Sequence, residues 1–129
     1  MSKALLINGS PHEHGCTYTA LHEVDMKLNE HQIETEMLYL GTEPIADCIN
    51  CGKCLKTGRC NFKDKVNEVL DCLNEFDAII LGSPVYYAGP TGMLCSFLNR
   101  LFYCGVYARL DVTVNGNYRG WNKEGILYK

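Results

Sequence analysis

The sequence predicts an α/β protein in which a parallel sheet carries helices on both faces. Three apolar runs of strand length alternate along the chain with three stretches of helical period, which is the pattern of β-α-β units. The first and third apolar runs both end in Gly-Ser-Pro and lead through a loop into a helix. With 129 residues, 47% of them hydrophobic, the chain suits a single domain over residues 1–129.

The first strand is expected at residues 3–8, an apolar run that stops at Gly9-Ser10-Pro11. A helix of about four turns should begin at Cys16, because apolar side chains then recur at helical spacing. The residues of this stripe are Tyr18, Leu21, Val24 and Leu28. Residues 33–39 alternate apolar and polar side chains, which predicts a strand at the sheet edge.

Residues 41–63 contain three glycines, a proline and four cysteines and have no regular period, so we expect a cysteine-rich loop. A second helix should follow, with Asp64 as its cap and an apolar stripe of Val66, Val69, Leu70 and Leu73. Residues 78–81 form a continuous apolar run typical of a buried strand.

A third helix is expected after Gly89-Pro90, ending near Gly105. Its apolar face would be Leu94, Phe97, Leu98 and Leu101. Residues 106–129 differ from the rest and form an atypical tail. Within it, residues 109–115 alternate well enough for one strand, and Asn115-Gly116 is a turn signal.

Charge and composition exclude several classes of partner. The net charge is −3 and lysines and arginines form no run, so we expect neither nucleic acid nor a membrane surface as a partner. No apolar stretch approaches the ~20 residues of a membrane span and no cleavable signal is visible, which predicts a cytoplasmic protein. In that setting eight cysteines favour metal or redox chemistry over disulfides.

The loop from Gly9 to Thr17 has the outline of a phosphate site. Unpaired N–H groups at a helix N-terminus favour an anion, and Ser10 and Thr17 add hydroxyl donors. The loop lacks both the lysine of a nucleoside triphosphate loop and the triple glycine of a dinucleotide fold. An ordinary strand-to-helix turn is the alternative for this segment.

The loop at residues 82–90 also joins a strand to a helix, and in a parallel sheet it should meet the first loop at the carboxyl ends of the strands. Tyr86 and Tyr87 could flank a flat aromatic ring while the loop backbone bonds its edge. The alternative is that both tyrosines pack against the following helix.

These two loops, together with Leu94-Cys95-Ser96-Phe97-Leu98-Asn99-Arg100, resemble the NAD(P)H-dependent FMN reductase branch of the flavodoxin superfamily over residues 3 to 104. The resemblance implies a flavodoxin-like three-layer sandwich with a parallel sheet of order 2-1-3-4, and FMN as cofactor. Its phosphate would lie on the first loop and its ring on the second. The implied FMN contacts are Ser10, Pro11, Gly15, Cys16, Thr17, Ser83, Pro84, Val85, Tyr86, Tyr87 and Gly89.

The sequence departs from this family at two places. Cys95 stands where the family commonly has lysine. The family also continues through a fourth strand, a glycine-rich loop, a helix and a fifth strand, whereas residues 106–129 can supply one strand at most. We therefore expect a fold truncated after the third or fourth strand. An open sheet edge predicts a homodimer or larger assembly, which the resemblance also implies.

The spacing Cys48-x2-Cys51-x2-Cys54-x5-Cys60 lets successive thiolates converge, as in ferredoxin-like ligation of a [4Fe-4S] cluster. Zinc and free or redox-paired thiols are the alternatives. The run is similar to the compact cysteine motif of the iron-sulfur flavoproteins, a group within the same reductase branch. The other four cysteines, Cys16, Cys72, Cys95 and Cys104, are expected to be small buried apolar residues.

The resemblance implies an oxidoreductase that passes electrons from NAD(P)H through FMN to a small-molecule or protein acceptor, with the cluster as an additional one-electron relay. No side chain is required as an acid or base, because the cofactor carries the chemistry. Two other functions fit the residues: a flavodoxin-type electron carrier that never meets a nicotinamide, and a non-enzymatic metal-binding or interaction domain.

Overall fold

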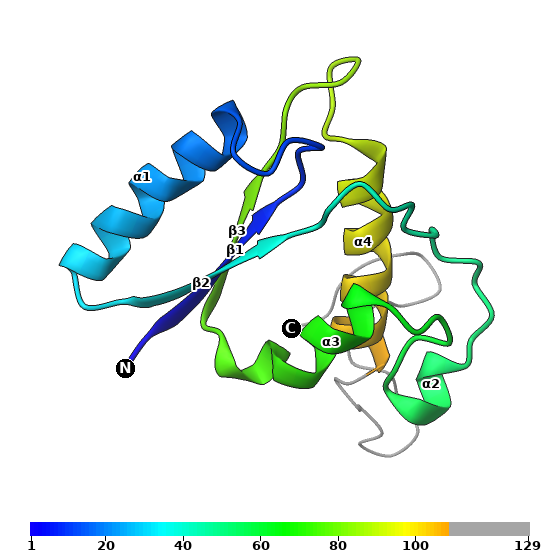
Figure 1. Cartoon of the computed structure of the whole chain (residues 1–129). Coiled ribbons are helices and arrows are strands. Elements are labelled where there is room, and N and C mark those ends of the chain that lie inside the picture. The colour runs from blue at the N-terminus through cyan, green and yellow to red at the C-terminus, as the bar shows by residue number, and fades with distance from the viewer. Residues whose placement is uncertain (109–129) are drawn as a thin grey trace.

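The computed structural model describes residues 1–108, which form three layers around a small parallel sheet (Figure 1). Strands β1 (Lys3–Asn8), β2 (Glu34–Tyr39) and β3 (Ala78–Gly82) lie in the order β2-β1-β3, and both pairings are parallel. The predicted α/β sandwich is confirmed, with the expected order of its first three strands. The strand predicted at residues 109–115 lies outside the described residues.

Helices cover both faces of the sheet because successive side chains of β1 point to opposite sides. Ala4 and Leu6 pack with Leu21 of α1 (Cys16–Glu30). On the other face, Leu5 and Ile7 join the larger core with α3 (Lys65–Cys72) and α4 (Gly92–Phe102). None of the helices in the described part of the chain is long and apolar enough to cross a membrane.

The two outer strands differ in their match to the sequence. β2 is an edge strand with partly exposed side chains, as predicted. β3 was expected to be buried, but Ala78 is exposed and Leu81 is 44% exposed. Within residues 1–108, β3 pairs with β1 alone, so its other edge and part of its surface stay open.

The helix ends follow capping chemistry. Asp64 Oδ1 accepts a hydrogen bond from the Val66 N–H (3.1 Å), which confirms the predicted cap of α3. Thr91 caps α4 in the same way through the Leu94 N–H (3.3 Å). A 3₁₀ turn (Leu73–Glu75) follows α3, and a π-helical turn (Tyr103–Ala108) extends α4 beyond the predicted end.

The sequence predicts an irregular loop at residues 41–63, but the structure contains a helical turn there. The loop contains α2 (Cys54–Thr57), a single turn that ends at Gly58. Gly58 has a φ of 68°, and its N–H bonds the Cys54 carbonyl at 2.7 Å. Glycine reaches this left-handed conformation without a steric penalty, so the chain can reverse just before Cys60.

Candidate functional site

The carboxyl ends of β1 and β3 bring the two predicted loops side by side (Figure 1). The Gly9 N–H donates to the Gly82 carbonyl at 2.8 Å, and Thr91 Oγ1 donates to the Gly9 carbonyl at 2.8 Å. A Cβ atom on Gly9 would lie 2.9 Å from Leu94 Cβ, and one on Gly82 would lie 2.7 Å from Leu21 Cδ1. Only glycine permits this approach, so both loops start from one fixed point.

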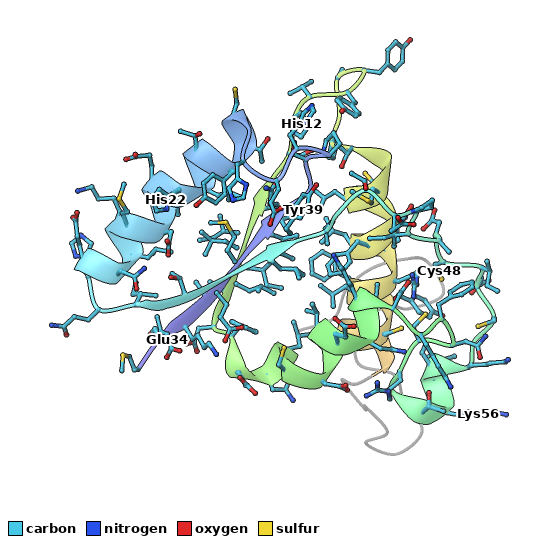
Figure 2. All side chains as sticks on the ribbon, viewed as in Figure 1. His12, His22, Glu34, Tyr39, Cys48 and Lys56 are labelled. Carbon is cyan, nitrogen blue, oxygen red and sulfur yellow. The ribbon has the colours of Figure 1, made fainter. Side chains whose placement is uncertain are left out.

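Side chains hold the first part of the first loop, at residues 10–12, in shape. The Ser10 N–H donates to Asn8 Oδ1 at 3.0 Å, and Ser10 Oγ accepts the His12 N–H at 3.1 Å. From β2, the Tyr39 hydroxyl donates to the Pro11 carbonyl at 2.8 Å. Figure 2 shows His12 and Tyr39 at this end of the sheet. The loop is therefore ordered by the protein itself.

The N-terminus of α1 offers the anion-binding chemistry expected there. Gly15 is the cap residue, and within the described residues no side chain accepts a hydrogen bond from the N–H groups of the first turn. The N–H groups of that turn are thus available to a ligand and lie at the positive end of the helix dipole. Thr17 and Ser83 also line a hollow of about 280 Å³ between α1 and β3. Of the residues predicted for the phosphate, Ser10 is buried, Pro11, Gly15 and Thr17 are half-buried, and Cys16 is exposed.

The second loop forms a tight turn above the first. Ser83 Oγ accepts the Thr91 N–H at 3.0 Å and donates to the Pro84 carbonyl at 2.8 Å. The backbones of Tyr86 and Gly89 bond each other in both directions, at 2.8 and 3.0 Å. These bonds fix the two ends of the turn.

The tip of this turn presents apolar side chains to solvent. Tyr87 and Ala88 have positive φ angles of 46° and 62°. The exposed fractions are 79% for Val85, 51% for Tyr86 and 106% for Tyr87. Tyr87 therefore does not pack on α4, which contradicts the packing alternative for this residue. An exposed apolar tip beside an anion-binding loop suits a flat ring that carries a phosphate.

The four motif cysteines surround one narrow cavity of about 20 Å³, roughly the room for one water molecule. Cys54 is buried, Cys60 is half-buried, and Cys48 and Cys51 are exposed. The cavity is completed by Ile49, Gly52, Asn61, Phe62, Arg100, Tyr103 and Cys104. Figure 2 places Cys48 on the far side of α4 from His12, so the two candidate sites are separate.

Cys104 is a fifth thiol at this cavity that the motif did not reveal. It is buried and lines the same cavity as Cys54 and Cys60. Burial, followed by the neighbouring thiols, raises the pKa of Cys104. Its burial was predicted, and its place three residues after Leu101 on the apolar stripe was the available signal. The prediction of burial was wrong for Cys16, which begins α1 and is exposed, whereas Cys72 and Cys95 are half-buried.

Asn67 and Arg100 fasten the loop and were also missed. Asn67 Oδ1 accepts the Cys60 N–H at 2.9 Å, and its Nδ2 donates to the Cys60 and Phe62 carbonyls, each at 2.9 Å. Arg100 Nε donates to Cys60 Sγ at 3.2 Å. Asn67 follows Val66 of one predicted apolar stripe and Arg100 precedes Leu101 of the other, and a polar side chain buried at such a place needs a partner. That requirement was the sequence signal for them.

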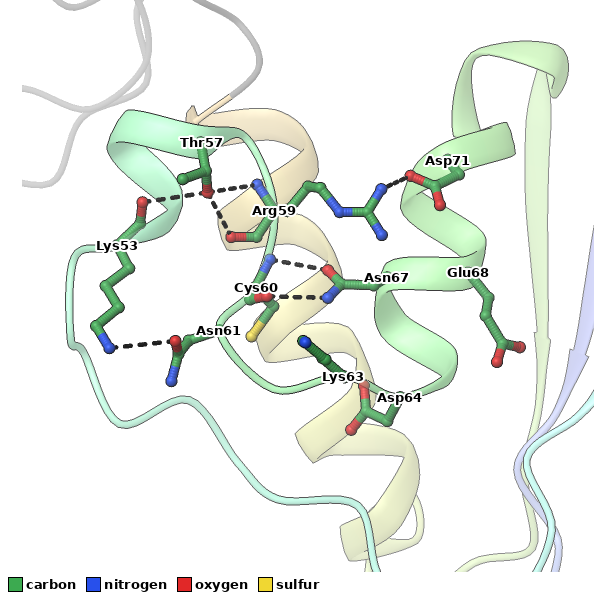
Figure 3. Close-up of a pocket in the computed structure, with 10 residues that line it drawn as sticks. All are labelled: Lys53, Thr57, Arg59, Cys60, Asn61, Lys63, Asp64, Asn67, Glu68 and Asp71. Atoms are coloured by element: carbon green, nitrogen blue, oxygen red, sulfur yellow. Dashed lines mark hydrogen bonds and ion pairs between the residues drawn. The ribbon is translucent and has the colours of Figure 1, made fainter.

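A hollow of about 560 Å³ lies outside this loop, between α2 and α3 (Figure 3). Arg59 forms an ion pair with Asp71 across it, and Asn67 bridges to Cys60 at its floor. Lys53, Lys63 and Glu68 add charges of both signs, so the hollow has no single electrostatic preference. It is distant from the strand ends where the flavin residues gather.

The donor set of the cysteine cavity fits an iron-sulfur cluster, since four thiols from one short loop face the same space. Burial raises the pKa of the Cys54 thiol, so a metal would have to displace its proton. In residues 1–108 no three metal-binding side chains are close enough to hold a single ion. The cavity must therefore widen for a cluster, and the exposed segment with Cys48 and Cys51 is the part that can move outward.

A profile of the family described as NADPH-dependent FMN reductase matches residues 2–123. The chain belongs to this family. An iron-sulfur flavoprotein of Methanocaldococcus jannaschii is 38% identical over 98 residues, which cover 76% of this chain and 51% of that protein. An iron-sulfur flavoprotein of Archaeoglobus fulgidus is 33% identical over 118 residues, covering 92% and 52%. One of Clostridioides difficile is 32% identical over 98 residues, covering 74% and 44%.

The chain thus spans about half the length of these relatives. Family membership agrees with the resemblance inferred from the two loops and the helix that follows them. The structure brings the predicted flavin residues together at one end of the sheet and the four motif cysteines together beside α4.

Proposed function

We propose that this protein is an FMN-binding oxidoreductase that passes electrons from NAD(P)H through FMN and a [4Fe-4S] cluster to a further acceptor. The observation that carries the proposal is the pair of loops fixed to each other at Gly9 and Gly82, in a member of the NADPH-dependent FMN reductase family. One loop offers N–H and hydroxyl donors, and the other offers exposed aromatic surface.

In this function the first loop and the start of α1 bind the flavin phosphate. Ser10 and Thr17 donate hydroxyl hydrogen bonds, and the open first turn of α1 donates backbone N–H groups. Val85, Tyr86 and the backbone around Gly89 would hold the ring. FMN supplies the hydride and electron chemistry when bound, so the protein orients the ring and limits its contact with water.

The names of the relatives and the cysteine cavity support the cluster. The three relatives above are called iron-sulfur flavoproteins. Cys48, Cys51, Cys54 and Cys60 are the ligands that we propose. The flavin loop lies at the N-terminus of α4, where Thr91 is the cap, and Arg100 lies near its C-terminus. The helical rise between these two residues is about 13 Å.

The test is an absorption spectrum of protein purified without oxygen, followed by titration with NADPH and NADH. We expect flavin bands, an additional broad band from the cluster, and bleaching of the flavin by a reduced nicotinamide. Flavin that is bleached by dithionite but by neither nicotinamide would favour the electron carrier. Colourless protein that takes up neither FMN nor iron would contradict the proposal and leave a non-enzymatic domain.

A further inference from the structure

Arg100 is a buried cation in direct contact with a cysteine of the cavity. Its side chain is 1% exposed and forms a two-pronged ion pair with Asp64, at 2.7 and 2.8 Å. Nη1 also donates to the Ala46 carbonyl at 3.1 Å, and the guanidinium lies 4.8 Å from the centre of the Phe62 ring. Nε donates to Cys60 Sγ at 3.2 Å.

This arrangement fixes the direction of the Nε–H bond. A guanidinium is planar, so once Nη1 and Nη2 bind Asp64 and Nη1 also binds the Ala46 carbonyl, the Nε–H cannot turn away from Cys60. An arginine guanidinium is protonated at any pH a protein tolerates. The side chain therefore stays charged, and it brings a permanent positive charge to the sulfur.

Burying such a charge costs more than a surface ion pair would. Arg59, the neighbour of Cys60 in the sequence, forms an ion pair with a lower desolvation cost. It pairs with Asp71 at the surface, with 48% of its side chain exposed. If Arg100 served only to fasten Asp64, a similar exposed pair would suffice. Its approach to Cys60 points to a role at the sulfur.

We propose that Arg100 is a positioning residue that holds Cys60 as a cluster ligand and raises the reduction potential of the cluster. The proposal rests on the cluster assigned under the proposed function. An N–H donor to a ligand sulfur and a nearby positive charge both favour the reduced, more negative cluster. Removing the arginine should therefore make the cluster harder to reduce.

Substitution of Asp64 should shift the reduction potential of the cluster in the opposite direction. Its carboxylate offsets the charge of Arg100, so Asp64→Asn should leave the cation less compensated and raise the potential. Asparagine is also a good N-cap, so α3 keeps its first-turn hydrogen bond. A role limited to packing would not produce shifts of opposite sign in the two partners of one ion pair.

The experiment is a potentiometric titration of the anaerobically reconstituted full chain, followed by the electron paramagnetic resonance signal of the reduced cluster. Iron and sulfide content and a thermal melt are measured for every variant. We expect a lower midpoint potential for Arg100→Met and a higher one for Asp64→Asn. Arg100→Lys keeps the charge but loses the Nε bond, so its potential should decrease by less than that of Arg100→Met. Arg59→Met is the matched control and should leave the potential unchanged.

Each outcome decides the matter. Wild-type protein that assembles no cluster would contradict the proposed function. A cluster whose potential is the same in wild type, Arg100→Lys and Asp64→Asn would overturn the role of Arg100 while leaving the cluster intact. If Arg100→Met does not retain four irons, the midpoint potentials of Arg100→Lys and Asp64→Asn still test the proposal. Shifts of opposite sign would support it, and shifts of the same sign would contradict it.

Discussion

Ser10 and Thr17 are the side chains most directly open to test at the flavin site. Ser10 Oγ accepts the His12 N–H, so its own O–H remains for a ligand. Replacing both residues by alanine removes two donors to a charged phosphate, each worth about 1.5–3 kcal/mol. We expect the affinity for FMN, measured by fluorescence quenching on titration, to fall about tenfold or more.

Thr19→Ala is a suitable control for this variant. Thr19 lies on the same helix, but its hydroxyl donates to the Gly15 carbonyl at 3.2 Å and is not needed for a ligand. FMN affinity should stay at the wild-type value in this variant. Equal affinity in the double variant and in wild type would mean that the phosphate binds elsewhere.

At the scale of single residues, the sequence reveals site residues that lie in one continuous loop, but not those that meet across long sequence separations. Ser10 to Thr17 and Ser83 to Gly89 are continuous loops, so their residue types could be recognised directly. Arg100 meets Asp64 across 36 positions and Cys60 across 40, and Cys104 joins the motif cysteines only through the packing of α4. No local pattern encodes such contacts.

At the scale of elements, the pattern of apolar residues predicted the three strands and three main helices because their apolar faces pack into the two clusters on either side of the sheet. It did not predict α2, a single turn whose formation depends on Gly58 and on burial of Cys54. The exposure of β3 was also missed, since the apolar run at residues 78–81 gives no information on which neighbours are present.

The cysteine-rich loop should become ordered when a cluster forms. Cys48 and Cys51 are exposed and the cavity holds about one water, so the loop must move to admit the cluster and is then tied by its ligands. Iron and sulfide added without oxygen should produce a broad band at about 400 nm and protect residues 46–60 in hydrogen exchange. Cys51→Ala should lose both effects while FMN still binds.

Cys104→Ser is the matched control, because it removes a thiol from the same cavity without removing a motif ligand. It should keep the band and the protection. Tight zinc binding with refusal of iron would make the site structural and end the electron-transfer role. Four freely titrating motif thiols after reconstitution would show that the loop binds neither metal.

At the scale of the whole molecule, the two candidate sites occupy opposite ends of α4, and both depend on this helix. Thr91 at its start joins the flavin loops, and Arg100 near its end contacts Cys60. Leu94 and Phe97 between them are buried in the larger core. The same helix thus sets the separation of the two candidate sites.

The open side of β3 predicts association of the protein with itself. Within residues 1–108, β3 pairs with β1 alone, and Leu81 is 44% exposed close to the apolar tip at Val85 and Tyr87. An unpaired strand edge with exposed apolar side chains favours pairing with another chain. We therefore expect light scattering of the full chain to give a homodimer or larger assembly.

Leu81→Lys should weaken this association, because a charge beside the open edge resists pairing. Thr42→Lys, in an exposed loop, is the control and should leave the association unchanged. A stable monomer at high concentration would contradict the prediction and would mean that the edge is covered within one chain.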